Sequence, residues 1–309
     1  MRLGIIGLGK MGGNMARRLR RAGIEVVGYD HNPEMTEALA EECGVTAAAD
    51  PRDLVEALDS PRAVWLMLPA GGVTEASVEQ MKGLLAPGDI LVDGANSWFK
   101  DSMRRGESLA ERGIEFVDAG VSGGVWGLEN GYALMVGGSP EAVGRLRPVI
   151  TALAPAPDRG WLHTGPAGSG HFVKMVHNGI EYGMMQAYAE GFALMQARPG
   201  WDLDLAGIAE MWRHGSVVRS WLLDLAAGFL AEDQRLEGIE PFVSDSGEGR
   251  WTAIEAIEQG VPTPVMSTAL MMRFASQGRQ DYASKVLAKM RQAFGGHATK
   301  DAEAGETPP

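Results

Sequence analysis

The glycine pattern near the N-terminus constrains the fold of this chain more than any other feature of the sequence. In RLGIIGLGKMGG, an apolar run leads directly into G-x-G-x-x-G, formed by Gly7, Gly9 and Gly12, and a helical pattern follows. The first glycine allows a tight turn, the second lets the backbone approach a pyrophosphate, and the third lets helix and strand pack closely. A phosphate would bind at the helix N-terminus, where free N–H groups and the helix dipole favour negative charge. The pattern therefore predicts a Rossmann-type α/β fold that binds a dinucleotide.

The residues after this loop indicate which dinucleotide is bound. Asp30 ends the next predicted strand, eighteen residues after Gly12, and no arginine occurs at 31–33. A carboxylate at this place accepts a hydrogen bond from the ribose 2′-hydroxyl and repels a 2′-phosphate, which favours NAD over NADP. The expected cofactor-binding residues are Gly7, Leu8, Gly9, Lys10, Met11, Gly12, Asp30 and His31.

Two kinds of pattern divide the chain. Up to residue 165, short apolar runs at 2–9, 25–30, 63–69, 89–96, 115–124, 133–138 and 161–166 alternate with helical patterns. This alternation is typical of βαβ units in a doubly wound parallel sheet with helices on both faces. Amphipathic helices are then expected at 168–197, 203–213, 216–231, 251–259, 264–276 and 281–293. The sequence predicts a Rossmann-type domain at 1–165, an all-helical domain at 166–297 and a disordered tail at 298–309.

Charge and cysteine content disfavour several classes of function. The 28 basic and 40 acidic residues give a net charge of −12, which would repel nucleic acid and anionic membranes. Cys43 is the only cysteine, which excludes an intrachain disulfide and suits a reducing compartment. The six histidines show no metal-site spacing, and no apolar run approaches the roughly 18 residues of a membrane span. We therefore expect a cytoplasmic protein without a metal, a nucleic-acid partner or a membrane partner.

The stretch HFVKMVHNGIEYG places chemically active side chains on a largely apolar helix. Lys174, Asn178, Glu181 and Tyr182 form one stripe, because positions three and four apart share a helix face, and His177 lies beside it. One reading is a solvated Lys–Glu surface pair with little energetic weight. The other is a base and an acid on a rigid scaffold, which suits proton transfer. The apolar residues on the other faces favour the second reading.

Five segments together resemble the decarboxylating 6-phosphogluconate dehydrogenases of the β-hydroxyacid dehydrogenase superfamily. They are GLGKMGGNMARRL, DGANSWFKDS, DAGVSGGVWGLENGYALMVGG, GSGHFVKMVHNGIEYGMMQ and GEGRWTAIEAIEQGVP. The resemblance spans nearly the whole chain and is most specific in KMVHNGIEYG. The chain is similar to the short, mostly NAD-linked bacterial form. This implies that NAD is reduced as 6-phosphogluconate is converted to ribulose 5-phosphate and CO2, a step of the pentose phosphate pathway.

The resemblance also implies roles for individual residues. Lys174 would be the general base during oxidation at C3, and Glu181 the acid that protonates C1 of the enediol after decarboxylation. Asn178 would support this chemistry and, with His177, bind sugar hydroxyls near C3. Asn96 would lie between the substrate and the nicotinamide. The substrate carboxylate would bind to the loop formed by Ser122, Gly123 and Gly124.

Other implied roles concern the sugar-acid phosphate and a second subunit. Tyr182 and Arg273 would bind the phosphate. Arg291 and His297, in RQAFGGH, would enter the neighbouring subunit's site. The helical domain would thus serve both substrate binding and dimerisation, in a homodimer or a dimer of dimers.

One departure from the family pattern bears on the phosphate. Ser246 and Glu248, in SDSGEGRWT, stand where long members carry a lysine and a threonine, which removes a cation and adds an anion. Arg250 is a candidate to compensate.

Two alternatives remain open. A non-decarboxylating enzyme of the 3-hydroxyisobutyrate type would share the glycine loop and the lysine, but such relatives lack HNGIEY. A non-catalytic dinucleotide sensor would have no use for Lys174 and Glu181 as a base and acid pair.

Overall fold

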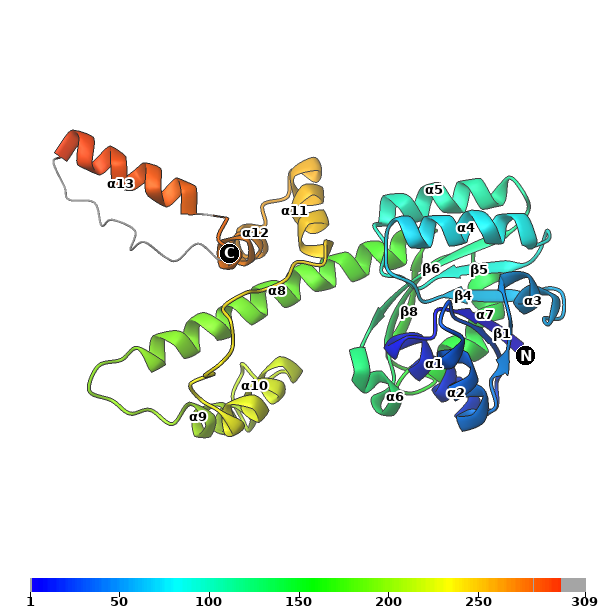
Figure 1. Cartoon of the computed structure of the whole chain (residues 1–309), viewed down its shortest axis with the longest axis horizontal. Coiled ribbons are helices and arrows are strands. Elements are labelled where there is room, and N and C mark those ends of the chain that lie inside the picture. Colours follow the sequence, from blue (N-terminus) through cyan, green and yellow to red (C-terminus); the bar gives the residue numbers. More distant parts are fainter. Residues whose placement is uncertain (1, 280, 296–309) are drawn as a thin grey trace, which may run out of the picture. The chain divides into compact units, whose positions relative to one another are not determined.

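A computed structural model describes residues 2–279 and 281–295 of the chain (Figure 1). The chain divides into two compact units, Met1–Asn178 and Gly179–Pro309, and the division falls within the long helix α8, Ser169–Gln196. The predicted tail at 298–309 and His297 lie outside the described residues. The predicted class, a Rossmann-type α/β part followed by helices, is confirmed.

The first unit is built on one eight-stranded sheet in the order β3-β2-β1-β4-β5-β6-β7-β8. The strands are β1 Arg2–Ile6, β2 Glu25–Tyr29, β3 Thr46–Ala47, β4 Ala63–Leu66, β5 Ile90–Asp93, β6 Glu115–Ser122, β7 Ala133–Gly138 and β8 Trp161–Gly165. Its helical elements are α1 Lys10–Arg21, α2 Pro33–Cys43, α3 Pro51–Glu56, α4 Gly72–Leu84, α5 Phe99–Ala110, η1 Gly124–Trp126, α6 Gly127–Asn130 and α7 Pro140–Leu153.

The expectation of a parallel sheet needs one correction. β7 pairs antiparallel with β6, whereas the other described strand pairs are parallel. Only residues 123–132 connect these two strands, and a parallel crossover needs a dozen residues or more. The two-residue strand β3 was also not expected, because it is too short to produce an apolar run.

Helices cover both faces of the sheet (Figure 1). Ile5 on β1 belongs to one buried layer, with Met15 of α1 and Ile150 of α7. The next residue, Ile6, belongs to the opposite layer, with Met81 of α4. Side chains alternate between the faces of a strand, so a strand covered on both faces reads as a continuous apolar run. Packed apolar side chains therefore cover both faces of the sheet. The candidate polar groups lie in loops that follow the carboxyl ends of the strands.

The second unit contains helices only. Beyond α8, they are α9 Leu205–Arg213, α10 Trp221–Glu232, α11 Glu248–Gln259, α12 Pro264–Ser276 and α13 Asp281–Gly295. Leu205, Ala209, Leu223 and Leu230 form a core between α9 and α10. α10 begins later than the expected 216, because Ser220 accepts a hydrogen bond from the Leu223 N–H and caps the helix. Among the described residues, no helix combines the length and apolar character that a membrane crossing requires.

A buried ion pair joins β5 to α5. The side chain of Arg105 is 1% exposed and donates to the Asp93 carboxylate at 2.8 Å, to Ser97 Oγ at 3.0 Å and to Glu75 Oε2 at 2.8 Å. The exposed Arg104 also donates to Glu75, at 2.7 and 2.9 Å. Hydrogen bonds from Arg104 and Arg105 lower the pKa of Glu75 from its ordinary value of 4.5 to about 2. This network joins the middle of α5 and the loop before α5 to the sheet.

Removal of Arg105 should therefore cost much more stability than removal of Arg104. Arg105→Met leaves the Asp93 carboxylate buried without its counter-charge, which should lower the free energy of unfolding by about 3–5 kcal/mol. Arg104→Met breaks an exposed pair and should cost at most about 1 kcal/mol. Urea denaturation of the two variants measures this difference, and equal losses would contradict the assignment.

Candidate active site

The glycine loop lies at the carboxyl end of β1, where the strand order reverses between β2 and β4. Gly7 has φ of +93°, and a Cβ on Gly12 would lie 1.9 Å from the Gly7 carbonyl oxygen. Both positions therefore require glycine. A Cβ on Gly9, the N-cap of α1, would meet no described atom within 4 Å. The N-terminus of α1 is thus open to a phosphate, as the fingerprint requires.

The Asp30 carboxylate is tied to the same loop. It is 8% exposed, and its two oxygens accept hydrogen bonds from Leu8 N at 2.6 Å and from Asn32 N at 2.9 Å. His31 Nδ1 lies 3.0 Å from Asp30 Oδ1, and its side chain is exposed. A carboxylate can accept about four hydrogen bonds, so Asp30 retains capacity for a ribose hydroxyl. These residues fit a dinucleotide without a 2′-phosphate.

The first turn of α8 is fastened to β6 by a buried carboxylate. Asp118 is fully buried, and its two oxygens accept from Gly168 N at 2.6 Å and His171 N at 2.7 Å. Burial raises the pKa of Asp118 above its ordinary value. A Cβ on Gly120 would lie 2.4 Å from the Cβ of Lys174, so the strand and the helix are in close contact there. These contacts fix the position of Lys174 relative to the carboxyl-terminal half of β6.

The polar stripe on α8 begins with a lysine that is not a surface residue. Lys174 is 6% exposed, and its Nζ donates to Asn178 Oδ1 at 2.7 Å. His177 Nδ1 lies 3.0 Å from the same oxygen. Three predicted site residues are thus in contact, with the amide oxygen of Asn178 between a lysine and an imidazole. Further along α8, Glu181 is half-buried and Tyr182 is buried.

Asn96 contacts the residue that precedes the predicted carboxylate loop. Asn96, between β5 and α5, donates from Nδ2 to the Val121 carbonyl oxygen at 3.1 Å and accepts from Val121 N at 2.8 Å. Ser122, which ends β6, is half-buried, and Gly123 and Gly124 follow with φ of +131° and +53°.

The second unit contains its own polar cluster. The Arg273 guanidinium lies 3.4 Å from the centre of the Tyr182 ring, and Arg273 Nη1 donates to the Ser244 carbonyl oxygen at 2.6 Å. The Tyr182 hydroxyl lies 3.2 Å from Ser246 Oγ, which donates to Glu248 Oε2 at 2.5 Å. The two predicted phosphate residues, Tyr182 and Arg273, are therefore in contact.

The remaining predicted cations have separate surroundings. Arg250 is ion-paired with Asp245 and faces the Phe274 ring at 4.7 Å, so its charge is already balanced. Arg291 is exposed on α13. Among the described residues, no group of three or more His, Cys, Asp and Glu side chains could hold a metal.

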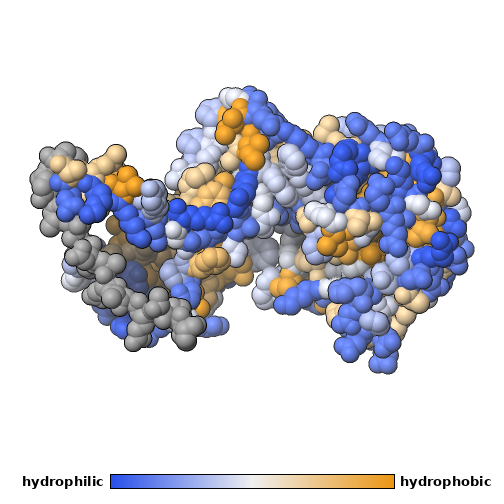
Figure 2. Space-filling view, turned by 45° about the horizontal axis from the view of Figure 1, so that its top comes forward, coloured by the Kyte–Doolittle hydropathy of each residue, from blue (hydrophilic) through white to orange (hydrophobic). Residues whose placement is uncertain are grey.

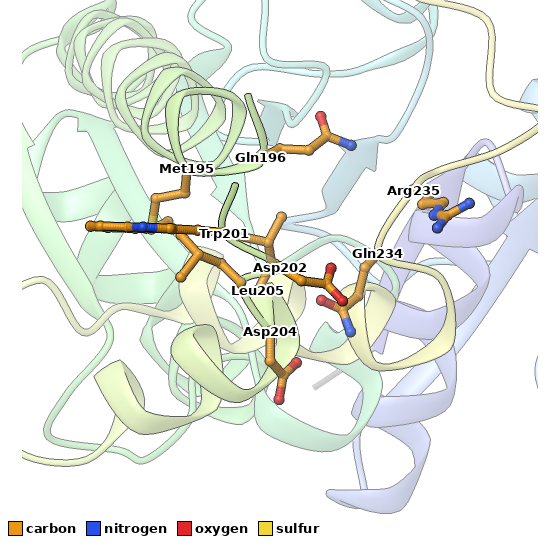
Figure 3. Close-up of a pocket in the computed structure, with 9 residues that line it drawn as sticks. Met195, Gln196, Trp201, Asp202, Asp204, Leu205, Gln234 and Arg235 are labelled. Atoms are coloured by element: carbon orange, nitrogen blue, oxygen red, sulfur yellow. The ribbon is translucent and has the colours of Figure 1, made fainter. Parts of the chain in front are cut away.

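A pocket of about 450 Å³ in the second unit lies apart from these residues (Figure 3). It is lined by Met195, Gln196, Trp201, Asp202, Leu203, Asp204, Leu205, Gln234 and Arg235. Figure 3 shows the flat Trp201 ring beside Leu205, and Arg235 away from the carboxylate of Asp204. No predicted site residue lines this pocket, and it is not part of the candidate site.

Sequence reasoning missed the residues that position the site. Asp118 and Arg105 received no role, although Asp118 carries a signal in the sequence. Asp118 interrupts the apolar strand at 115–124, and a charge inside such a strand needs a partner because it would otherwise be buried alone. The partner itself, the start of α8, was not visible in the sequence.

Comparisons with known proteins agree with this geometry. Residues 2–164 match the family model described as the NAD binding domain of 6-phosphogluconate dehydrogenase, and residues 170–306 match that enzyme's C-terminal domain. The chain is 42% identical over 304 residues to the NAD(+)-dependent, decarboxylating 6-phosphogluconate dehydrogenase of Haloferax volcanii, covering 97% of this chain and 100% of that one. It is 40% identical over 300 residues to a putative 6-phosphogluconate dehydrogenase of Bacillus subtilis, with 97% and 99% covered.

Solved structures show the same relationship. Plasmodium falciparum 6-phosphogluconate dehydrogenase has a TM-score of 0.83 at 29% identity, over 99% of this chain and 67% of that chain. A 3-hydroxyisobutyrate dehydrogenase from Salmonella typhimurium has a TM-score of 0.73 at 26% identity, over 90% of this chain and 95% of that chain.

The close contact between β6 and α8 gives a direct stability prediction. Gly120→Ala would push Lys174 away from the strand and should lower the free energy of unfolding by about 1–3 kcal/mol, as overpacking does. The control is Gly144→Ala on the exposed face of α7, where a Cβ meets no described atom within 4 Å. This control should be neutral or stabilising by up to about 1 kcal/mol. Urea denaturation measures both, and a neutral Gly120→Ala would refute the contact.

Proposed function

The chain belongs to the 6-phosphogluconate dehydrogenase family, and we propose that it converts 6-phosphogluconate to ribulose 5-phosphate and CO2 while reducing NAD. The observation that carries this proposal is the buried Lys174, hydrogen-bonded to Asn178 and fastened to β6 through the first turn of α8. A relative with 42% identity over nearly the full chain is named as NAD(+)-dependent and decarboxylating.

The first unit holds the cofactor. The open N-terminus of α1 at Gly9 would bind the pyrophosphate, and Asp30 would accept a hydrogen bond from the adenosine ribose. The exposed His31 and the first α1 residues, Lys10 and Met11, would border this site. NAD, when bound, supplies the acceptor for a hydride. The chain's own residues must therefore place C3 of the substrate and remove its hydroxyl proton.

Lys174 would be the general base. It would take the C3 hydroxyl proton as the hydride leaves C3, which gives a 3-keto acid. The protonated Lys174 would then donate a hydrogen bond to the carbonyl oxygen as the C1 carboxyl leaves as CO2, stabilising the charge that develops there. Glu181 would protonate C1 of the resulting enediol to give ribulose 5-phosphate. Asn178 would keep the lysine head group aimed through the 2.7 Å hydrogen bond.

The other predicted residues would bind the substrate. His177 and Asn178 would contact hydroxyls near C3. Ser122 and the backbone of Gly123 and Gly124 would bind the carboxylate. The side chains in these roles lie at the carboxyl end of β6 and in the first half of α8.

The phosphate would be bound by Tyr182 and Arg273. Arg273 would supply the positive charge, because Arg250 is paired with Asp245 and Glu248 holds the Ser246 hydroxyl. A phosphate that binds to Ser246 here would have to compete with the Glu248 carboxylate for the Ser246 hydroxyl.

We also propose a homodimer, alone or as half of a dimer of dimers. Tyr282, Val286, Leu287 and Met290 form an exposed apolar stripe on α13 at helical spacing. A largely apolar pocket of about 610 Å³ in the same unit is lined in part by Tyr188 and Trp212. Figure 2 shows apolar side chains among hydrophilic ones on the surface of this unit. Exposed apolar surface of this kind supports association, and Arg291 and His297 would then enter the neighbour's site.

The proposed reaction predicts a fixed stoichiometry. Purified enzyme with 6-phosphogluconate and NAD should form NADH and CO2 in a one-to-one ratio. Turnover should be poor with gluconate or 3-hydroxyisobutyrate as the substrate, and with NADP as the cofactor.

Lys174→Ala should lose at least about 100-fold in kcat because general-base catalysis is lost. Glu181→Gln should slow the final protonation and leave the cofactor dissociation constant unchanged. NADH without CO2, or normal turnover of Lys174→Ala, would refute the mechanism.

The proposed dimer predicts the effect of a charge on α13. Leu287→Asp should shift the mass measured by light scattering from dimer to monomer, because it places a carboxylate in the apolar stripe. Ser284→Asp adds the same charge to the same helix away from the stripe and should leave the dimer intact. An unchanged mass for Leu287→Asp would count against this interface.

A further inference from the structure

The aromatic ring of Tyr132 supports the turn that follows Ser122. Tyr132 immediately precedes β7 and is fully buried, in the layer of the core that also contains residues of α1 and α7. A Cβ on Gly127 would lie 2.0 Å from Cε1 of this ring, and a Cβ on Gly123 would lie 3.4 Å from its Cδ1. The backbone at both glycines therefore lies against one buried ring.

The side chains of the turn contribute little to its placement. Val125 and Trp126, which form η1 with Gly124, are each 53% exposed. Gly123 and Gly124 have positive φ, and glycine loses more conformational freedom on ordering than other residues do. A turn of this composition needs contacts from outside itself if it is to present a ligand site accurately. The ring of Tyr132 is one such contact.

Arg18, in the last turn of α1, holds the far end of the same segment. Its guanidinium donates to the carbonyl oxygens of Leu128 at 3.1 Å and Glu129 at 3.4 Å, both in α6. It also donates to three carbonyl oxygens at the end of α7, those of Ala152 at 3.0 Å, Leu153 at 3.1 Å and Ala154 at 2.7 Å. The last carbonyl groups of a helix lack partners within it and carry partial negative charge, which suits a guanidinium. Arg18 thus ties α6 to α1, the helix that follows the glycine loop (Figure 1).

The ring of Tyr132, and not its hydroxyl, makes the contacts with the turn. Among the described residues the buried hydroxyl has no hydrogen-bond partner. Burial raises the pKa of Tyr132 to about 12, and the nearby charge of Arg18 offsets part of this rise. The phenol is therefore neutral near pH 7, and removal of its hydroxyl should leave the support of the turn intact.

We propose that Tyr132 and Arg18 are positioning residues, which act on the reaction through Ser122, Gly123 and Gly124. The Tyr132 ring sets the position of the turn, and Arg18 fixes the end of the segment to α1. One helix therefore holds both the loop for the cofactor pyrophosphate and the turn for the substrate carboxylate. This inference rests on the proposed function, in which the turn binds the carboxylate of 6-phosphogluconate.

Loss of either support should weaken the binding of a carboxylate selectively. Tyr132→Leu keeps an apolar side chain in the core and removes the ring from the turn. It should raise the dissociation constant of 6-phosphogluconate by about 10- to 100-fold, the value of a hydrogen bond to a charged group. The dissociation constant of ribulose 5-phosphate, which has no carboxylate, should change by less than about 2-fold. Arg18→Met, which leaves the core unchanged, should act in the same way.

Isothermal titration calorimetry with the two ligands measures this selectivity. Equal weakening of both ligands in these variants would mean a general structural defect, and unchanged binding of 6-phosphogluconate would mean that the turn needs neither support. Each of these results would overturn the proposal.

Two matched variants serve as controls. Tyr132→Phe retains the ring and should bind both ligands as the wild type does. Arg21→Met removes a cation from the same helix, but the bond of Arg21 to Glu129 Oε1 at 2.9 Å is an exposed ion pair. It should also bind both ligands normally, which controls for the loss of a positive charge. Losses in the controls as large as those in Tyr132→Leu and Arg18→Met would contradict the proposal.

Hydrogen exchange tests the support of the turn without any ligand. The Gly131 amide donates to the Gly127 carbonyl oxygen at 3.0 Å, at the end of α6. Its exchange should be at least about 10-fold faster in Tyr132→Leu and Arg18→Met than in the wild type, because the segment opens locally when a support is lost. Unchanged exchange at Gly131 in both variants would overturn the proposal.

The folding control is the Ile90 amide, which donates to the Arg62 carbonyl oxygen at 2.8 Å within the sheet. Its exchange should stay unchanged in these variants. Equal acceleration at Gly131 and Ile90 would show general destabilisation and would also overturn the proposal. Failure of the wild type to bind 6-phosphogluconate would instead count against the proposed function.

Discussion

Two buried carboxylates support the candidate site, and the way in which each is satisfied places the groups around it. Asp93, the last residue of β5, is paired with Asp118 in the middle of β6. Arg105 neutralises Asp93, whereas Asp118 receives the N–H groups of Gly168 and His171 at the start of α8. Burial, and to a smaller degree the charge of Asp93, raises the pKa of Asp118. Neither carboxylate could remain buried without these partners. The two carboxylates therefore fix the loop after β5 and the start of α8.

The same part of the sheet fixes the position of Lys174, the base in the proposed mechanism. Asp118 holds the first turn of α8, and Lys174 follows three residues after His171 on that helix. Gly120 allows β6 and α8 to approach closely beneath the lysine. At β1, Gly7 and Gly12 allow the comparable approach that opens the N-terminus of α1. Glycines and buried carboxylates in these strands thus fix the glycine loop after β1 and the position of Lys174 without any bound ligand.

Sequence reasoning recovered the elements that periodicity determines. The strand runs, the glycine loop and the helix carrying Lys174 follow from spacing and composition, and the stripe on α8 was visible as residues three and four apart. Tertiary pairing was not recoverable. The antiparallel β7, the Asp118 contact with α8 and the Asn96 contact with Val121 depend on which strands become neighbours and in which register. Resemblance to a family supplied candidate roles, but it did not reveal that the Asn96 amide is engaged by backbone.

The most direct measurement of the central claim, that hydride leaves C3 of the substrate beside Lys174, uses 6-phosphogluconate carrying deuterium at C3. The account predicts that the deuterium appears in the reduced nicotinamide, that ribulose 5-phosphate is unlabelled, and that CO2 accompanies each transfer. Deuterium retained in the sugar product, with unlabelled NADH, would contradict oxidation at C3 and the role given to Lys174.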